Sequence, residues 1–190
     1  SKLNGYLGLV GLNRTTNEFY ISSKSSPQGP YADMVVDLVE KLGAERKLKL
    51  KNYLKANDVT LVFEVIKYKE DPHIIKYDKD KLILLSIVEN TINFKDRDYE
   101  EVIELSNKLN LECKEKLVVL NNWEEFKAFY KECMKEDIYD IEGEHIEGLV
   151  IECENGFIVK LKMPYYNYWK KMRGTIERYK KGNENALDGL

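Results

Sequence analysis

Apolar and polar side chains alternate in several short stretches, most of them near the two ends of the chain. Successive side chains of a strand point to opposite faces, so this pattern predicts β-strands. The predicted strands are residues 5–11, 18–24, 59–67, 82–88, 117–120, 146–152 and 156–163. A polar turn at 13–17 and the sequence Glu154-Asn155-Gly156 predict that the first two strands and the last two strands form hairpins.

Five helices are predicted, chiefly from apolar residues that recur every three or four positions. They are residues 31–42, 44–54, 98–109, 122–135 and 164–181. Residues 25–30 are predicted to form a loop, and 182–190 a polar, frayed tail. Strands at the two ends with helices between them predict an α+β fold of antiparallel sheets with inserted helices, as one domain over residues 1–181.

The composition is that of a folded chain without a basic coat. Of the 190 residues, 43% are hydrophobic, which is enough for a buried core, and 33% are charged. The 30 basic and 33 acidic residues give a net charge of −3, which excludes a strongly basic surface throughout but permits a local basic groove.

Cysteine content and hydropathy indicate the cellular compartment in which the chain works. The three cysteines have no metal-ligand spacing, and their odd number argues against a disulfide framework, so we expect a reducing, cytoplasmic environment. No apolar run approaches the roughly 18 residues of a membrane span, and no signal peptide is visible. We therefore expect no membrane partner.

The first candidate for chemistry is Lys2, in the sequence Lys2-Leu3-Asn4-Gly5. A lysine amine becomes nucleophilic when neighbouring cations and a dry pocket depress its pKa from the usual value of about 10.4. Asn4 lies on the same face as Lys2 if the segment is extended, and Gly5 lets the backbone approach a phosphate closely. The alternative is an exposed lysine beside a turn.

Glu64 lies within an apolar strand, on the same predicted face as Val62 and Ile66. A carboxylate in such a place is costly to bury without a cation, a sugar hydroxyl or a metal as partner. The alternative is a solvated glutamate on an edge strand.

Glu147 presents the same case in a second strand, and Gly148 beside it removes a side chain where another group must come close. A lone carboxylate suits Mg²⁺, which takes most of its other ligands from phosphate and water. The predicted hairpin brings Lys160 and Lys162 to the adjacent strand, where they could clamp an α-phosphate or simply balance nearby acids in solvent.

The order of these motifs resembles the covalent nucleotidyltransferase superfamily of DNA ligases, RNA ligases and mRNA capping enzymes. Lys2-Leu3-Asn4-Gly5 resembles the nucleophile motif lysine-x-aspartate-glycine, in the asparagine form of tRNA ligases. The run of residues 22–26 around Lys24 resembles the serine-lysine-glycine-serine motif of phage-type RNA ligases. The sequences at Glu64 and Glu147, and the pair Lys160 and Lys162, resemble the third, fourth and fifth motifs. Residues 71–75 and 82–85 also resemble phage and fungal tRNA-repair ligases.

The resemblance implies a nucleotidyltransferase, ATP-grasp-like ligase fold around a nucleotide cleft, and it implies an enzyme. Lys2 would attack ATP and hold AMP, and the AMP would pass to an RNA 5′-phosphate that a 3′-hydroxyl then seals, possibly in tRNA. Glu147 would bind Mg²⁺ or Mn²⁺. Asn4, Gly5, Lys24, Glu64, Lys160 and Lys162 would bind the nucleotide, with both lysines of the pair also stabilising charge as pyrophosphate leaves.

Other functions remain open. The same scaffold could join DNA, transfer guanylate for capping, or bind nucleic acid without catalysis. The family usually carries a segment before the nucleophile and sometimes a further C-terminal domain, so we expect that this chain is a fragment that lacks both.

Two further features have more than one interpretation. His73 could contact RNA or phosphate, or be an ordinary loop histidine. The aromatic cluster Tyr165-Tyr166-Tyr168-Trp169 could stack bases, although packing of the last helix on the sheet is the preferred interpretation. The basic residues that follow it could track an RNA backbone or form a solvated helix end.

Overall fold

The computed structural model describes residues 1–71, 73–135, 140–141 and 144–187. They form two compact units that interleave along the chain. The first, which we call the hairpin unit, comprises Ser1–Asn4, His73–Lys76 and the chain from Lys116. The second, which we call the sheet unit, comprises Gly5–Pro72 and Tyr77–Glu115. The single domain predicted over residues 1–181 remains a prediction.

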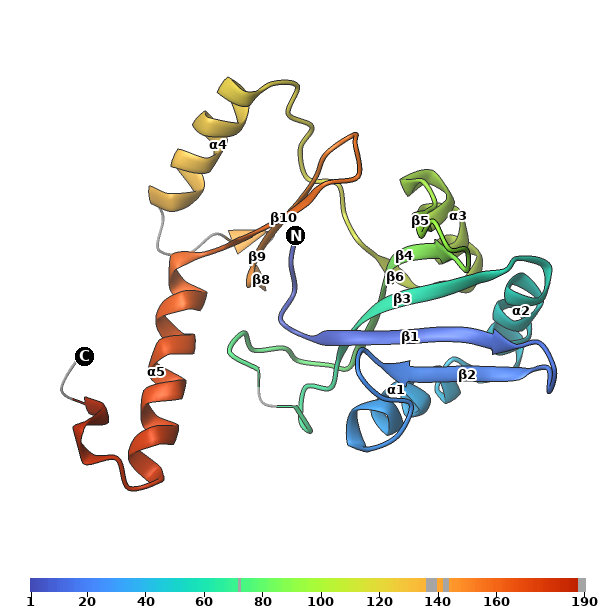
Figure 1. Ribbon diagram of the computed structural model, residues 1–190, viewed down its shortest axis with the longest axis horizontal. Coiled ribbons are helices and arrows are strands. Elements are labelled where there is room, and N and C mark those ends of the chain that lie inside the picture. Colours follow the sequence, from blue (N-terminus) through green and yellow to red (C-terminus); the bar gives the residue numbers. More distant parts are fainter. Residues whose placement is uncertain (72, 136–139, 142–143, 188–190) are drawn as a thin grey trace. The chain divides into compact units, whose positions relative to one another are not determined.

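The sheet unit is built on a mainly antiparallel sheet of order β2-β1-β3-β4-β5 (Figure 1). Its strands are β1 (Tyr6–Asn13), β2 (Glu18–Ser23), β3 (Val59–Ile66), β4 (Lys81–Glu89) and β5 (Lys95–Asp96), and β6 (Glu112–Cys113) pairs with β4 in parallel. Its helices are α1 (Pro30–Glu40), α2 (Gly43–Ala56) and α3 (Tyr99–Leu109). Strand residues such as Leu61, Phe63 and Val65 pack with residues of all three helices in one core, as the predicted alternation requires.

Helix α3 shows how local sequence sets the ends of an element. The side chain of Asp98 accepts a hydrogen bond from the backbone N–H of Glu101 at 3.0 Å, which caps the first turn. At the other end Asn110 takes the left-handed conformation, with φ of 50°, and ends the helix. Both ends agree with the predicted range of 98–109.

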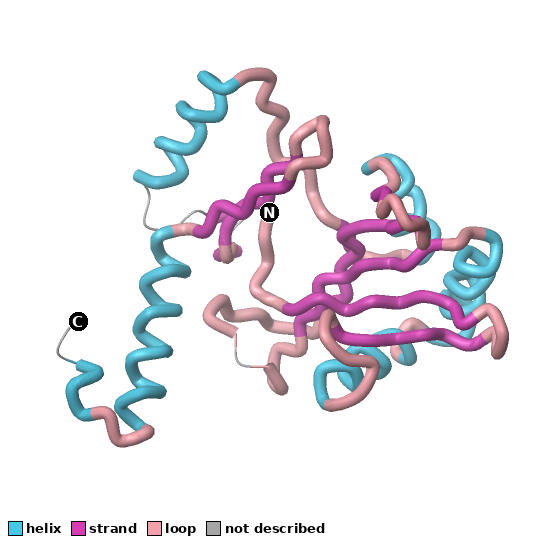
Figure 2. Tube along the Cα trace, viewed as in Figure 1, coloured by secondary structure: helices cyan, strands magenta, loops and turns pink. Residues whose placement is uncertain are grey.

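The hairpin unit contains one long hairpin that leads directly into a helix (Figure 2). Its elements are α4 (Trp123–Lys135), β7 (Asp140–Ile141), β8 (Glu144–His145), β9 (Gly148–Glu152), β10 (Ile158–Lys162), α5 (Pro164–Lys180) and a 3-10 helix (Glu184–Leu187). Strands β9 and β10 are antiparallel, and Gly156 takes a φ of 81° in the predicted turn between them. Cys133, Ile146, Leu149 and Met163 form the core of this unit.

The structure confirms the predicted α+β class and corrects three details. Residues 117–120 form no strand: they are apolar, but Val118 and Val119 are exposed and no strand of the described chain pairs with them. The very short strands β5 and β6 have too few residues to show an alternating pattern. The polar tail was predicted to be frayed, but its described part forms the 3-10 turn.

An ion network around the buried side chain of Lys67 stabilises the sheet unit beyond the end of β3. The side chain of Lys67 is only 4% exposed, and its Nζ lies 2.8 Å from Asp37 and 2.9 Å from Asp80. Burial alone would lower the pKa of Lys67, but hydrogen bonds and charge attraction from the two carboxylates outweigh it and raise that pKa above the ordinary value. Lys67 therefore stays charged and holds two carboxylates together.

We expect Lys67→Met to lower the free energy of unfolding by about 1–3 kcal/mol, because Asp37 and Asp80 would lose their buried counter-ion. Lys41→Met is the matched control: Lys41 binds the same two carboxylates but is 58% exposed, so its loss should cost less than about 1 kcal/mol. Urea denaturation measures both values, and equal losses would contradict the role given to Lys67.

The same contacts determine how the difference in unfolding free energy between the parent and Lys67→Met depends on pH. Hydrogen bonds from lysines lower the pKa of Asp37, and those from Lys67 outweigh burial to lower the pKa of Asp80. The network therefore stabilises the fold above the unfolded pKa of about 3.9 and loses its effect as the pH falls through the lower folded values. The difference between the parent and Lys67→Met should be full at neutral pH and shrink under acid conditions.

Candidate active site

Lys2 is held beside β9 by its backbone. Its N–H donates to the carbonyl of Gly148 at 2.7 Å, and its carbonyl accepts from the N–H of Glu147 at 2.9 Å. On the other side of Gly148, the β9–β10 register places Lys162 as its partner. Gly148 thus lies between the two lysines.

Gly148 has to be glycine for this arrangement. A Cβ at this position would overlap the carbonyl oxygen of Leu161 and approach Cα of Lys162 to 2.9 Å. A side chain would therefore displace β10. The sequence predicted that another group comes close to Gly148, and in the structure that group is the backbone of β10.

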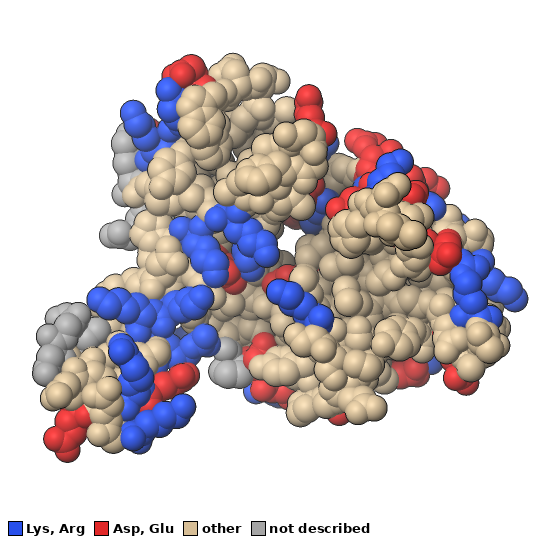
Figure 3. Space-filling model, in the orientation of Figure 1, with Lys and Arg blue, Asp and Glu red and all other residues tan. Residues whose placement is uncertain are grey.

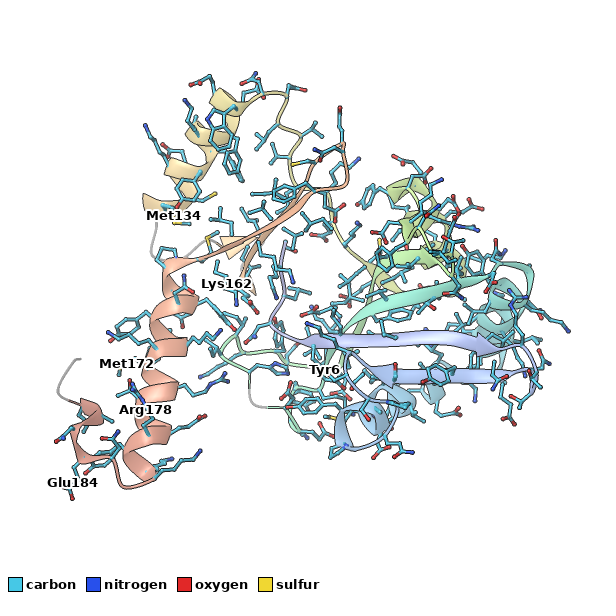
Figure 4. The ribbon with its side chains drawn as sticks, viewed as in Figure 1. Tyr6, Met134, Lys162, Met172, Arg178 and Glu184 are labelled. Atoms are coloured by element: carbon cyan, nitrogen blue, oxygen red, sulfur yellow. The ribbon has the colours of Figure 1, made fainter. Side chains whose placement is uncertain are left out.

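The carboxylate of Glu147 joins the two lysines. Figure 4 labels one of them, Lys162, near the start of α5. Oε1 of Glu147 lies 2.9 Å from Nζ of Lys162, and Oε2 of Glu147 lies 3.1 Å from Nζ of Lys2. The Glu147 side chain is only 4% exposed. Burial would raise the pKa of Glu147, but the contacts with Lys162 and Lys2 outweigh it, and the pKa lies below its ordinary value. The buried group is thus a charged carboxylate with two counter-ions.

Asn4 gives Glu147 a third donor. Its Nδ2 donates to Oε2 of Glu147 at 3.2 Å, while its Oδ1 accepts from the N–H groups of Ile74 (2.8 Å) and Ile75 (3.2 Å). Two backbone donors on the oxygen fix which way the amide points. Asn4 therefore connects the carboxylate to the segment His73–Lys76 of the same unit.

Lys162 also has an aromatic neighbour that sequence reasoning had not linked to it. Its Nζ lies 4.9 Å from the ring centroid of Tyr166, one turn into α5. Burial would lower the pKa of Lys162, but Glu147 outweighs burial and raises it. Burial, with the negative charge of Glu147, raises the pKa of Tyr166. The signal available in the sequence was the spacing of four residues between Lys162 and Tyr166, with Pro164 between them.

The predicted lysine pair is divided. Lys162 binds Glu147, whereas Lys160, opposite Val150, has an exposed side chain. In the described part of the chain, the cations that bind Glu147 are Lys2 and Lys162. A phosphate-binding role for Lys160 remains a prediction.

Gly5, Lys24 and Glu64 belong to the sheet unit. Glu64 is 7% exposed and accepts a hydrogen bond from the N–H of Gly5 at 2.8 Å. Glu64 pairs with Leu7 across the sheet, and the carbonyl of Leu7 also accepts from the N–H of Lys24, whose side chain is exposed. The partner that Glu64 was predicted to need is thus in part a backbone amide, and the nucleotide-binding roles of these residues remain predictions.

The residues fit a divalent cation in one respect. Glu147 is a buried, ionised carboxylate whose counter-charges are lysines, and Mg²⁺ is commonly held by one or two carboxylates with phosphate oxygens. Among the described residues, no group of three or more His, Cys, Asp or Glu side chains could hold a metal by itself. Among the described side chains, Glu147 would thus supply only part of the ligands of a metal, and water or phosphate could supply others.

We expect Glu147→Gln to lower the free energy of unfolding by about 2–3 kcal/mol, because a neutral amide leaves two ammonium groups together without a counter-ion. Glu154→Gln, an exposed acid in the β9–β10 turn, is the control and should change it by less than about 0.5 kcal/mol. Since the folded pKa of Glu147 is lowered, its contribution is present above the unfolded value of about 4.3 and is lost as the pH falls further. A constant difference in urea denaturation from pH 7 to pH 3 would contradict this assignment.

Comparison with known proteins gives the family and the fold. The sequence model of a family described as RNA ligase matches residues 1–166. A tRNA ligase of Candida albicans is 31% identical over 142 residues, which cover 66% of this chain but only 17% of that protein. A Naegleria gruberi RNA ligase structure superposes with a TM-score of 0.67 at 15% identity, covering 90% of this chain and 50% of that one.

These similarities settle fold and family. The structural match confirms the predicted ligase fold, although the chain spans about half or less of the relatives' lengths. In the described residues, no helix is long and apolar enough to cross a membrane. Because the family model spans most of the sequence, the chain belongs to the RNA ligase family.

Proposed function

We propose that this chain is the adenylyltransferase part of an ATP-dependent RNA ligase, with Lys2 as its nucleophile. The observation that carries the proposal is the shared carboxylate: Lys2 and Lys162 bind opposite oxygens of buried Glu147 in a chain of the RNA ligase family. That arrangement gives an amine, a second cation and a carboxylate in contact, and phosphoryl transfer from a nucleotide depends on such positioning and charge compensation.

The reaction would proceed in three displacements at phosphorus. The neutral amine of Lys2 attacks the α-phosphorus of ATP, an N–P bond forms, and the P–O bond to pyrophosphate breaks. The 5′-phosphate of RNA then takes the AMP from Lys2, and a 3′-hydroxyl displaces the AMP to form the phosphodiester. The Naegleria ligase structure contains PPi, which is the leaving group of the first displacement.

The residues around Lys2 would position it and compensate charge. Lys162 would move from Glu147 to the phosphate as negative charge develops on the leaving group, and Lys160 would add a second cation from the same strand. Asn4 would keep Glu147 in place through its fixed amide. Gly5, Lys24 and Glu64 would contribute to nucleotide binding. Glu64 would contact the ribose, and Lys24 would contact phosphate or the ribose.

Lys2 would attack as a neutral amine, and its Nζ lies 3.1 Å from Oε2 of Glu147. Glu147 would hold a bound Mg²⁺ or Mn²⁺, and the charge of that ion would compensate the negative charge of the triphosphate. The RNA ends of a cleaved tRNA are the first substrate to test, because the Candida relative is named a tRNA ligase. A cytoplasmic location remains a prediction.

The decisive experiment is transfer of label from α-labelled ATP to the chain, measured after denaturation. We expect a covalent, acid-labile adenylate with the parent and with Lys55→Ala, an exposed lysine of α2, and none with Lys2→Ala. Lys2→Arg is the sharper variant: it keeps the charge beside Glu147 but is not nucleophilic, so it too should form no adenylate. Label on Lys2→Arg, or none on the parent, would overturn the proposal.

Labelling, sealing and RNA-binding assays on the same protein separate the alternatives. Label from GTP rather than ATP would indicate capping chemistry, and sealing of DNA but not RNA nicks would indicate a DNA ligase. Salt-sensitive RNA binding without any covalent nucleotide would indicate a non-catalytic nucleic-acid-binding module.

The two lysines of β10 should differ in what their loss does. Lys160→Ala and Lys162→Ala should each lower adenylate formation about tenfold or more, because each removes a cation from the transition state. Only Lys162→Ala should also lower Tm, since Lys162 is a counter-ion of buried Glu147 and Lys160 is exposed. Thermal unfolding of both variants checks this, and a matching fall in Tm for Lys160→Ala would contradict it.

A further inference from the structure

An open groove lies along one face of α5, within the hairpin unit. It has a volume of about 370 Å³ and is bounded on one side by His73 and Ile74. The helix lines it with residues three or four positions apart, which is one face of a helix: Trp169, Met172, Arg173, Ile176, Glu177 and Lys180.

The opposite wall of the groove is tied down. Ile74 and Ile75 donate their backbone N–H groups to Oδ1 of Asn4, and the Ile75 side chain is 2% exposed. The helical wall begins one turn after Tyr166, which is buried. The groove therefore has two walls that are each fixed to the unit.

The helical wall of the groove offers aromatic and apolar surface to solvent. Trp169 is 45% exposed and Ile176 is 43% exposed. Trp169 meets Tyr165 and Tyr168 edge-on, with ring centroids 6.2 Å and 5.5 Å away. The preferred prediction for this aromatic cluster, packing against the sheet, is not what Trp169 shows: an exposed ring in a groove is a surface on which a planar ligand can stack.

The helix that carries the groove is strongly basic. Between Pro164 and Lys180 it has five basic residues and one acidic residue, Glu177, on a chain whose net charge is −3. Lys and Arg side chains gather over α5 on the face that Figure 3 shows. The local basic surface that net charge could not reveal thus coincides with the exposed indole.

We propose that this groove binds one nucleotide of the RNA strand, with its base stacked on Trp169 and its flanking phosphates beside Arg173 and Lys180. The proposal rests on the proposed function for the identity of the ligand, and extends it with a site for single-stranded RNA apart from the nucleophile. A stacking aromatic combined with cations spaced along a helix is the combination that single-stranded nucleic acid requires.

Glu177 argues against a free anion as the ligand. It lines the groove between the two cations and repels phosphate. A nucleotide can place its phosphates at the cations and its base over the indole, whereas a phosphate ion makes no favourable contact with the apolar side chains of the groove. Glu177 should therefore weaken RNA binding without preventing it.

The test is fluorescence anisotropy of a labelled oligoadenylate of about 12 nucleotides, with the full chain and a series of salt concentrations. Trp169→Ala should weaken binding about tenfold or more, and Trp169→Phe, which keeps a stacking face, should restore most of the affinity. Arg173→Ala should reduce the slope of log K against log salt by about 0.7. Glu177→Gln should tighten binding about twofold to fivefold, because it removes a repelling charge.

Matched controls lie on the same helix outside the groove. Tyr179→Ala removes an aromatic ring that is 49% exposed, and Lys171→Ala removes an exposed cation. Tyr179→Ala should bind the RNA within about twofold of the parent, and Lys171→Ala should weaken binding less than Arg173→Ala does. Circular dichroism and Tm establish that every variant is folded.

Any one of three results would overturn the proposed RNA site. In the first, Trp169→Ala binds RNA as tightly as the parent; in the second, Tyr179→Ala weakens binding as much as Trp169→Ala does. In the third, the parent shows no salt-sensitive RNA binding. Adenylate formation on Lys2 requires no RNA and is measured on the same parent preparation. Adenylate without groove-dependent RNA binding refutes this inference alone, whereas groove-dependent RNA binding without adenylate refutes the proposed function alone.

Discussion

The hairpin unit depends on one buried charge. Glu147 is almost completely removed from solvent, and a carboxylate there is tolerated only because Lys2, Lys162 and Asn4 all donate to it. The donors come from two parts of the chain: Lys2 and Asn4 belong to its first residues, and Lys162 ends β10. With the segment that carries Glu147 itself, the charge specifies where three chain segments meet, and the Lys2 amine is positioned as a result.

Backbone geometry makes this meeting possible. Lys2 pairs with Gly148 on one side and the register of β9 and β10 pairs Lys162 with it on the other. Because Gly148 has no side chain, the backbone of β10 comes close enough for Lys162 to reach Glu147. Asn4 extends the same arrangement to Ile74 and Ile75, so a polar network and a hydrogen-bonded backbone support each other.

Much of this could be predicted from local pattern, and the rest required tertiary contacts. Alternation located the long strands, and the turn at Gly156 located the hairpin, because both depend on neighbouring residues only. Residues 117–120 have the composition of a strand but lack a partner, which no local pattern reveals. The motifs identified Lys2, Glu147 and Lys162 but not that one carboxylate binds both lysines.

The aromatic cluster illustrates the same limit. Tyr166 is buried beside Lys162, whereas Trp169, three residues later, is exposed in a groove. Helical periodicity places residues three apart on the same side of a helix, so it does not predict that one ring is buried and the other exposed. Similarly, Glu64 was expected to need a charged or hydroxylic partner, and the backbone N–H of Gly5 satisfies part of that need.

The charge count around Glu147 has a thermodynamic consequence. Two ammonium groups share one carboxylate, so an anion that draws either lysine away leaves Glu147 buried with less compensation. A cation bound at the carboxylate would relieve that deficit and release the lysines for the anion. Any anion and cation that bind here would therefore be reciprocally coupled: each would raise the affinity for the other by the same factor, even without a change of backbone.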